Sequence, residues 1–530
     1  MIDPQRIRQD LAFFARETPS RGAGSPDEAR AFAYAATGLA EAGWEVGFEE
    51  FTTLVSRVKA TTVEVEGGGA LPAMGIGYAT ARGAGRWLDL VDAGDGGPAA
   101  YQGLSAGGAA VLVASGGPGV PDKAFIAQRQ GAVGLLLVSP PSPEPTLALR
   151  AQKGVWGPPQ PEDLFDLPDV TSVSLTYEDG HRLRELLRRQ GALRVRLAAA
   201  AETAWRPLRQ LVARLGPIER PFLLLHGHVD AWSPGVTDNA TGLAALLAAA
   251  RALAAGPPLP RAVRLALWSG HEVEEAAGST AFVDRHWRDL RRCVLHLNVD
   301  SPGCAGGERV ILYRSLELQA RAREVLDRRG IPVAAELPLA KESDNAFALA
   351  GVPGLGVVPA GETTLRPDGV PVGPLWWMHT DRDGLDAVRD DLLQRDAELL
   401  LDLTRSLALA ARVHDFRPVA SVLDPVLRDL SDQELSALWD RAQAVLAAAD
   451  GAAARSVSRL LLAHIGTRGG RLRQDRYGDP LYAYEYPGIA HLLGAPAEEP
   501  TLPHARLRER NRLDDLMHAL ADLEATSDGL

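Results

Sequence analysis

The sequence lacks several features that would place it outside the ordinary globular proteins. Only two of its 530 residues are cysteine, Cys293 and Cys304, which is too few for a disulfide framework. No apolar run approaches the roughly 18 to 20 residues that a membrane-spanning helix needs. Residues 1–17 are charged and amphipathic, without the basic, apolar and small-residue layout of a signal peptide. We therefore expect a cytoplasmic protein with no membrane contact.

A concentration of positive charge is also missing. The formal net charge is −12, and no basic stripe is present, so we expect no nucleic-acid partner. With 46% hydrophobic and 23% charged residues, the composition is that of a globular protein with a large core. A chain of 530 residues is enough for roughly three domains at about 150 residues each.

The most informative stretch is residues 223–242, LLLHGHVDAWSPGVTDNATG. An apolar run leads to His228 and Asp230, and a loop then leads to Asp238, Asn239 and an Ala/Leu-rich run. This pattern predicts a buried strand, a loop and a helix, with Asp238 or Asn239 as the helix N-cap. Alternate residues of a strand face the same side. His228 and Asp230 therefore suit a metal-bound imidazole that is oriented by a carboxylate.

Further polar residues come after later strand-like runs. His271 and Glu272 come after the next such run, Asp300 after the one beyond it, and His379 precedes a long helix. Asp344 lies in another polar loop. Ligands of open α/β sheets bind at the carboxyl ends of the strands. Histidines and carboxylates at these ends predict a dinuclear metal site.

In combination, these motifs resemble metallopeptidase family twenty-eight, the co-catalytic zinc aminopeptidases and glutamate-carboxypeptidase-like proteins, over residues 21–412. The family has a His-x-Asp motif, a bridging Asp before Asn, a strand-end Asp, and a final His in a His-Thr-x-x-Asp context. The matching residues here are His228 and Asp230, Asp238, Asn239 and Gly242, Asp300, and His379, Thr380 and Asp383. The resemblance implies two Zn2+ per chain and a cis peptide between Asp238 and Asn239.

The sequence departs from the family where the family has a Glu-Glu pair, general base first and metal ligand second. Counted from Trp268, these positions are His271 and Glu272. Counted back from the Gly-Ser of residues 278–279, they are Glu272 and Val273. Trp268 is the better anchor, because a sheet fixes the ends of its strands and extra residues collect in loops.

The resemblance also implies a role for each ligand. Asp238 bridges both metals, His228 and Asp300 complete one site, and His379 and Glu272 complete the other.

The identity of the general base stays open among three residues, His271, Glu272 and Glu274. His271 is favoured, with a pKa expected near neutrality. Glu274 and Glu275 are otherwise most simply a solvated face. His226 and His296 are expected to be packing residues, and Trp376 and Trp377 either line the substrate pocket or pack in the core.

Strand-like runs alternate with helix-like runs from residue 205 onward, which predicts an α/β fold with a doubly wound, mainly parallel sheet. We expect the catalytic domain to comprise residues 1–55 and 205–415. Residues 56–204 resemble an inserted protease-associated α/β domain, with a strand–helix–strand unit at residues 109–138, and would wall one side of the cleft. Residues 416–530 are expected to form a helical C-terminal domain, through which a homo-oligomer could assemble.

These features favour a zinc-dependent exopeptidase that acts on peptide or aminoacyl substrates, most simply an aminopeptidase. One alternative is an amidohydrolase with a non-peptide substrate. The other is a non-catalytic peptide-binding or scaffold protein, which the altered residues 271–273 would favour.

Overall fold

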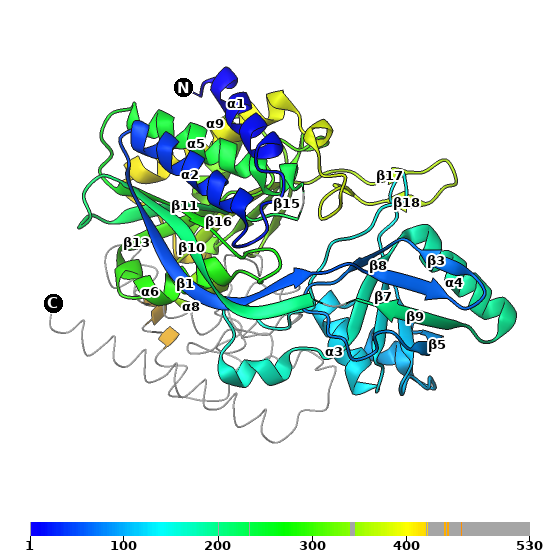
Figure 1. The fold of residues 1–530 in the computed structure, drawn as a ribbon. Helices are drawn as coiled ribbons and strands as arrows, with labels where there is room; N and C mark the ends of the chain where they lie inside the picture. Colours follow the sequence, from blue (N-terminus) through cyan, green and yellow to red (C-terminus); the bar gives the residue numbers. More distant parts are fainter. Residues whose placement is uncertain are drawn as a thin grey trace.

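The computed structural model describes residues 2–199, 201–232, 234–339 and 345–419, together with 421, 439–440, 442–444 and 457. Among them, no helix is both long enough and apolar enough to span a bilayer. Asp344 and most of residues 416–530 lie outside this range, so the predictions for them stay predictions. Two eight-stranded sheets, set side by side in Figure 1, dominate the described chain.

The first sheet has the strand order β1-β10-β12-β11-β13-β16-β14-β15. Its strands are β1 (Glu45–Val58), β10 (Ala201–Leu215), β11 (Phe222–His228), β12 (Ala262–Trp268), β13 (Cys293–Asn298), β14 (Val310–Arg314), β15 (Val333–Leu337) and β16 (Gly354–Pro359). The central run β12-β11-β13-β16 is parallel. The pairs β1–β10, β10–β12 and β14–β16 are antiparallel. The pair β14–β15 at one edge is parallel as well. The sheet is therefore mixed but mainly parallel, as predicted.

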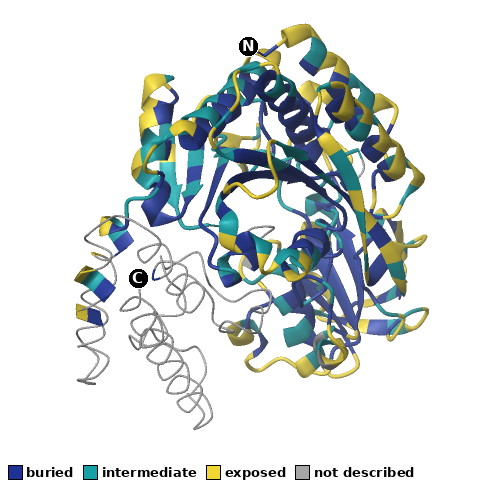
Figure 2. Ribbon diagram, turned by 90° about the vertical axis from the view of Figure 1, so that its left-hand side faces the viewer, coloured by how far each residue is buried: buried dark blue, intermediate teal, exposed yellow. Residues whose placement is uncertain are grey.

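Helices cover both faces of this sheet, which explains why every residue of β11 is buried. Leu223 and Leu225 pack toward one group of helices, and Phe222 and Leu224 toward the other. The first group is α1 (Pro4–Arg16), α2 (Pro26–Glu41), α5 (Thr241–Ala254), α7 (Gln319–Arg328) and α9 (Asp390–Leu409). The second is α6 (Ala277–His286) and α8 (Asn345–Leu349). Figure 2 shows the buried residues gathered in the strands and on the inner sides of the helices.

The second sheet has the order β3-β2-β9-β5-β6-β7-β8-β4. Its strands are β2 (Thr62–Val65), β3 (Gly69–Leu71), β4 (Ala73–Gly75), β5 (Trp87–Asp92), β6 (Ala110–Val113), β7 (Gly134–Val138), β8 (Thr171–Leu175) and β9 (Arg194–Ala198). Helices α3 (Val120–Arg129) and α4 (Tyr177–Gln190) accompany it. Strands β6 and β7 are parallel and joined through α3, which confirms the predicted strand–helix–strand unit. We call this sheet, its helices and the loops between them, residues 62–198, the second unit.

A long two-stranded ladder connects the two sheets. Strands β1 and β10 pair without interruption from Glu45 opposite Arg214 to Val58 opposite Ala201. In Figure 1 this ribbon runs from the first sheet to the second unit. Shorter elements are η1 (Pro98–Tyr101), η2 (Pro161–Asp166), η3 (Val236–Ala240), η4 (Asp289–Arg292), η5 (Leu316–Leu318), η6 (Leu385–Ala387), and the hairpin strands β17 (Thr364–Leu365) and β18 (Pro371–Val372).

Candidate active site

Five of the predicted site residues converge at the carboxyl ends of the central strands. Nε2 of His228, at the end of β11, lies 3.1 Å from Oδ1 of Asp238 and 3.7 Å from Oδ2 of Asp300. Nε2 of His379 lies 2.8 Å from Oδ2 of Asp238 and 3.4 Å from Oε2 of Glu272. Asp238 thus lies between the two histidines, with one carboxylate oxygen toward each. The predicted convergence is confirmed.

The residues present fit a metal site, because several of their ligand atoms are buried without a hydrogen-bond partner. These atoms are Nε2 of His228, Oδ1 of Asp238, Oε1 of Glu272 and Nδ1 of His271. Leaving a buried polar atom unpaired costs roughly 1–3 kcal/mol, more for a charged group, unless a cation takes the lone pair. Two sets of three ligand atoms each lie within 4.8 Å of one another: His228, Asp238 and Glu272, and His228, His271 and Asp300.

The charges of the site favour a cation as well. Burial raises the pKa of Glu272 well above 4.5, and the neighbouring Asp238 raises it further. Burial alone would lower the pKa of His228, but Asp238 and Asp300 outweigh it and raise that pKa well above 6.5. For Asp238, burial raises the pKa, yet contacts with His228 and His379 outweigh it and hold the pKa well below 3.8. The carboxylates thus create a negative potential that a bound cation would relieve.

Asp230 was predicted to orient His228 through its carboxylate, and this prediction is wrong. The carboxylate holds the loop that carries His271 and Glu272, and the backbone of Asp230 contacts His228. Nδ1 of His228 lies 2.8 Å from the backbone carbonyl oxygen of Asp230. The carboxylate instead accepts hydrogen bonds from the backbone N–H of His271, at 2.9 and 3.0 Å, and of Glu272, at 2.9 Å. Asp230 therefore serves the site twice, once through its backbone and once through its side chain.

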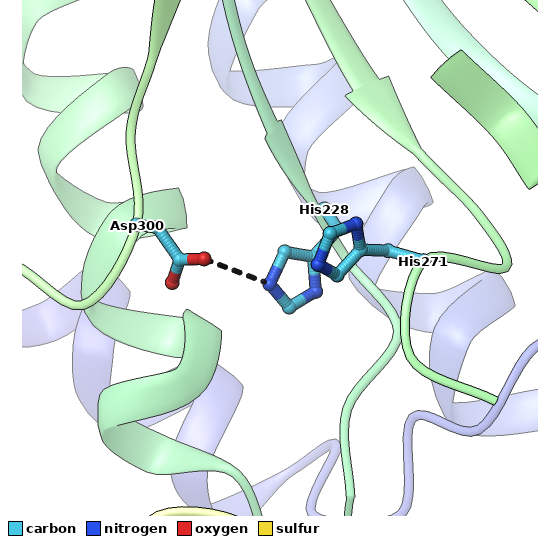
Figure 3. Close-up of side chains that lie close together, drawn as sticks. All are labelled: His228, His271 and Asp300. Atoms are coloured by element: carbon cyan, nitrogen blue, oxygen red, sulfur yellow. Dashed lines mark ion pairs between the residues drawn. The ribbon is translucent and has the colours of Figure 1, made fainter. Parts of the chain in front are cut away.

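His271 lies against His228, with ring centroids 4.2 Å apart and an angle of 23° between the ring planes. Figure 3 shows the two rings facing each other, with Asp300 directed at His228 from the opposite side. The expected pKa near neutrality is wrong. Burial lowers the pKa of His271 well below 6.5, and the charge of His228 lowers it further. The ring is therefore neutral at physiological pH and keeps a lone pair available.

The turn that presents Asp238 contains a cis peptide between Asp238 and Asn239, as predicted. The predicted N-cap is wrong. The cap residue of α5 is Ala240, and no side chain caps this helix end. The Asn239 side chain instead donates to the carbonyl of Val299 at 2.9 Å and accepts from the N–H of Ser301 at 3.3 Å. Asn239 thereby ties the Asp238 turn to the loop that carries Asp300.

Asp383 and Arg21 hold the turn that presents Asp238 through hydrogen bonds to its backbone and side chains. Asp383 accepts hydrogen bonds from the N–H and hydroxyl of Thr237, at 2.8 and 2.7 Å, and from the N–H of Asp238 at 3.0 Å. Arg21, which is fully buried, donates to the carbonyls of Val229 at 3.0 Å and Gly235 at 2.6 Å. Sequence reasoning missed Arg21, because an arginine in a Gly-rich turn near the N-terminus carries no signal of such contacts.

Non-glycine residues in the left-handed region gather around the site. Ser301 comes directly after Asp300 with φ 53°, and His379 itself has φ 55°. In the loop after Glu272, Glu275 and Ala276 have φ 49° and 57°. Such backbone is uncommon for non-glycine residues and persists where the surroundings fix it, often at functional sites.

Glu274 does not belong to a solvated face, contrary to expectation. Its side chain is 1% exposed and accepts a hydrogen bond from the N–H of Ser56 at 3.2 Å. Burial, and next the charge of Asp230, raise the pKa of Glu274 to about 8. No local signal predicts this burial, because the second unit and β1 that cover the residue are distant along the chain.

The other predicted residues have structural partners. Nε2 of His226 lies 3.0 Å from Nδ1 of His296, and Nε1 of Trp268 donates to Nδ1 of His226 at 3.1 Å. Both histidines are fully buried, which confirms the packing role. Trp377 is partly buried and donates from Nε1 to the hydroxyl of Thr237 at 3.2 Å, behind the Asp238 turn.

A mixed α/β sheet that gathers histidines and carboxylates at its strand ends is the arrangement of a metal-dependent hydrolase of the zinc-peptidase type. Comparison with known proteins makes the class specific. Residues 210–404 match the profile of Peptidase family M28, the family that the motifs resemble.

One curated relative is similar to part of the chain. The chain is 27% identical over 291 residues to the "Probable lipoprotein aminopeptidase LpqL" of Mycobacterium tuberculosis, a match to 53% of this chain and 54% of that protein. It thus spans about half the length of this curated relative.

Two solved aminopeptidases share the fold. One, from Aneurinibacillus sp. strain AM-1, is 18% identical with TM-score 0.59, over 78% of this chain and 95% of that one. The other, the zinc aminopeptidase BSAP from Bacillus subtilis, is 17% identical with TM-score 0.61, over 77% of this chain and 96% of that one.

Proposed function

We propose that the protein is a zinc-dependent exopeptidase that removes N-terminal residues from peptides. The observation that carries the proposal is the convergence of His228, Asp238, Glu272, Asp300 and His379 with unpartnered ligand atoms at the strand ends. The family match and the named aminopeptidase activity of the relatives support it.

The ligand set divides between two proposed Zn2+ ions. His228 and Asp300 would hold one ion and His379 and Glu272 the other, and Asp238, which has one oxygen toward each histidine, would be shared between them. When bound, such ions lower the pKa of a water molecule and polarise the carbonyl of the bond to be cleaved.

The protein's own groups would position and move the proton. Asp230 fixes the backbone of His271 and Glu272. We assign His271 as the residue that accepts the proton of the attacking water, because its ring lies against His228 and its Nδ1 has no hydrogen-bond partner. His271 also lies within ligand distance of His228 and Asp300, so it could instead be a zinc ligand. Removal of the imidazole would lower the zinc content if His271 is a ligand, and would leave it unchanged if His271 is the general base.

The second unit is proposed to be a protease-associated-like insert that walls the site. It reaches the ligand loops directly, since the N–H of Leu149 donates to the carbonyl of His379 at 2.8 Å. Arg366, on the β17–β18 hairpin, donates a hydrogen bond to the Glu178 side chain of α4 at 2.6 Å, which adds a second contact with the second unit. Such a wall would limit the substrate to one residue on the N-terminal side of the scissile bond, as an aminopeptidase requires.

A comparison of blocked and free peptides tests the activity. Purified zinc-loaded protein is incubated with a short peptide and with its N-acetylated form, and products are identified by mass spectrometry. Stepwise shortening of the free peptide alone supports an aminopeptidase. Zinc binding without cleavage of either peptide would favour a peptide-binding protein, and cleavage only of non-peptide amides would favour an amidohydrolase.

Location and assembly stay predictions. The sequence favours a cytoplasmic protein. The relative is named a lipoprotein aminopeptidase, which favours a location outside the cytoplasm. A homo-oligomer through residues 416–530 involves a region that lies mostly outside the described residues.

A further inference from the structure

A lysine of the second unit reaches the loop that carries His271 and Glu272. Lys153 is fully buried, and its ammonium donates to the carbonyl of Glu274 at 2.7 Å and to the carbonyl of Gly157 at 2.5 Å. The N–H of Gly157 in turn donates to the carbonyl of Glu275 at 2.6 Å. Two hydrogen bonds from the second unit therefore end on consecutive carbonyls of one short loop.

This loop is held at its other end by the first sheet. The carboxylate of Asp230 accepts from the N–H of His271 and Glu272. Between the two anchors, the chain turns back on itself through the left-handed residues Glu275 and Ala276, and the N–H of Ala276 bonds the carbonyl of His271 at 3.0 Å. The direction of His271 and Glu272 thus depends on a strained bend, and Lys153 holds that bend.

The charges around Lys153 match this role. Burial lowers the pKa of its ammonium to about 8, while the carboxylates of Glu275, Glu274 and Asp163 raise it. A buried ammonium is costly unless its N–H groups are bonded. The two carbonyls that receive them therefore become fixed points, one in the second unit and one in the loop.

We propose that Lys153 is a positioning residue that sets the shape of the loop of residues 271–276, so that the second unit forms part of the active site. This inference rests on the proposed function. Whether or not the protein cleaves peptides, the backbone carrying Glu272 and His271 is fixed from the second unit through the ammonium group of Lys153.

The chain offers a matched control in Lys123, the other buried lysine of the second unit. Its ammonium donates to the carbonyls of Gly116 at 2.6 Å and Pro118 at 2.5 Å, and burial lowers its pKa to about 8 as well. Lys123→Met and Lys153→Met therefore each remove an ammonium that bonds two carbonyls. Only Lys153→Met releases the loop of the site.

The experiment compares both variants with the wild-type holoenzyme in zinc affinity, kcat and KM. Lys153→Met is expected to weaken zinc binding and to lower kcat by roughly 10–100-fold each, with KM changed much less, as for loss of an outer partner of a metal site. Lys123→Met should leave zinc affinity and kcat within about twofold. Equal zinc affinity and equal kcat in the two variants would overturn the proposal.

Hydrogen exchange of the peptide spanning residues 269–278 keeps the inference separate from the proposed activity. In metal-free protein, Lys153→Met should speed exchange of the amides that bond Asp230, and Lys123→Met should not. If the wild type cleaves no peptide, the exchange difference still decides the inference. Should Lys153→Met fail to fold, Lys153→Gln and Lys123→Gln form the pair. The Gln side chain is one bond shorter than Lys and does not reach both carbonyls that the ammonium bonds, so exchange should be faster in Lys153→Gln than in Lys123→Gln. Matching exchange in the two variants would contradict the role.

Discussion

The two eight-stranded sheets have similar cores but differ in how the polar residues after their parallel strands are paired. In the second unit, Ser139 after β7 accepts from the N–H of Ala148 at 2.9 Å, and Thr176 after β8 accepts from the N–H of Asp179 at 3.0 Å. Asp92, at the end of β5, pairs with Arg184 at 3.2 Å. Each of these strand-end polar groups has a partner from its own unit.

In the first sheet, the corresponding groups are aimed at one another. His228 lies at the end of β11 and Asp300 just after β13, with Nε2 of His228 directed at the Asp300 carboxylate. Nε2 of His228, Oδ1 of Asp238 and Oε1 of Glu272 are buried there without a hydrogen-bond partner. The comparison shows that parallel strands alone do not make a site. What makes one is a set of buried ligand atoms that the protein itself leaves unsatisfied.

The largest effect on activity and zinc affinity is expected from a substitution at Asp238, the central residue of the site. Asp238→Asn removes the carboxylate that faces both His228 and His379. Activity and zinc affinity should fall by more than the roughly 10–100-fold that loss of an outer partner costs. Asp92→Asn, at a strand end of the second unit, is the control and should change neither. Equal behaviour of the two variants in zinc titration and peptide hydrolysis would erase the distinction between the sheets.

His271→Ala tests the altered position of the site. If the imidazole accepts the proton, turnover should fall by about 10²–10⁴-fold while zinc content stays constant. Glu272→Ala, in contrast, should lower zinc content. Metal analysis and kinetics on the two variants separate the roles. Full activity of His271→Ala would move the base to Glu272 or Glu274.

Asp230→Asn should give a smaller loss. The amide keeps the shape of the side chain but weakens its bonds to the N–H groups of His271 and Glu272. We expect a decrease of roughly 10–100-fold in zinc affinity or activity. Thermal unfolding checks that the fold is retained, and unchanged zinc affinity and activity would remove Asp230 from its positioning role.

The smallest expected effect is on the pH dependence of the free energy of unfolding, through Glu28. Burial, and next the charge of Asp230, raise the pKa of Glu28 well above 4.5. The folded state therefore binds a proton that the unfolded state has lost, and stability falls as pH rises above about 4.5. In urea unfolding, Glu28→Gln should gain stability relative to wild type between pH 5 and pH 8.

The exposed Glu185 of α4 is the control for this prediction. Arg188 and Arg189 lower the pKa of Glu185 to about 2, so its contribution is complete above about 4.5 and is lost only as pH falls below that value. Glu185→Gln should therefore differ from wild type by the same amount at pH 5 and pH 8. A flat difference for Glu28→Gln as well would refute the raised pKa.

Much of the fold and the ligand set could be predicted from the sequence, because both depend on local signals. Strand β12 and helix α5 are indicated by apolar runs bounded by turn residues, and the metal ligands are histidines and carboxylates placed just after such runs. The antiparallel pairing of β10 with both of its neighbours was not predicted, since no local pattern tells whether a strand pairs parallel or antiparallel.

The supporting contacts could not be predicted, because they join distant parts of the chain. The bond from Lys153 to the carbonyl of Glu274 spans 121 residues, and the bond from Arg21 to the carbonyl of Val229 spans 208. The burial of Glu274 depends on the same distant cover. For His228, the backbone bends so that the carbonyl of Asp230 reaches Nδ1, which strand alternation alone does not foresee.

Zinc binding and hydrolysis measured on the same samples test the proposed metal site most directly. Metal-free protein is titrated with Zn2+ while release of the N-terminal residue from a short peptide is followed. We predict two Zn2+ per chain, with hydrolysis that requires bound zinc and that is abolished together with tight zinc binding in Asp238→Asn. Unchanged zinc binding in Asp238→Asn would contradict the assignment of the site, and full zinc occupancy without hydrolysis would contradict the assignment of the activity.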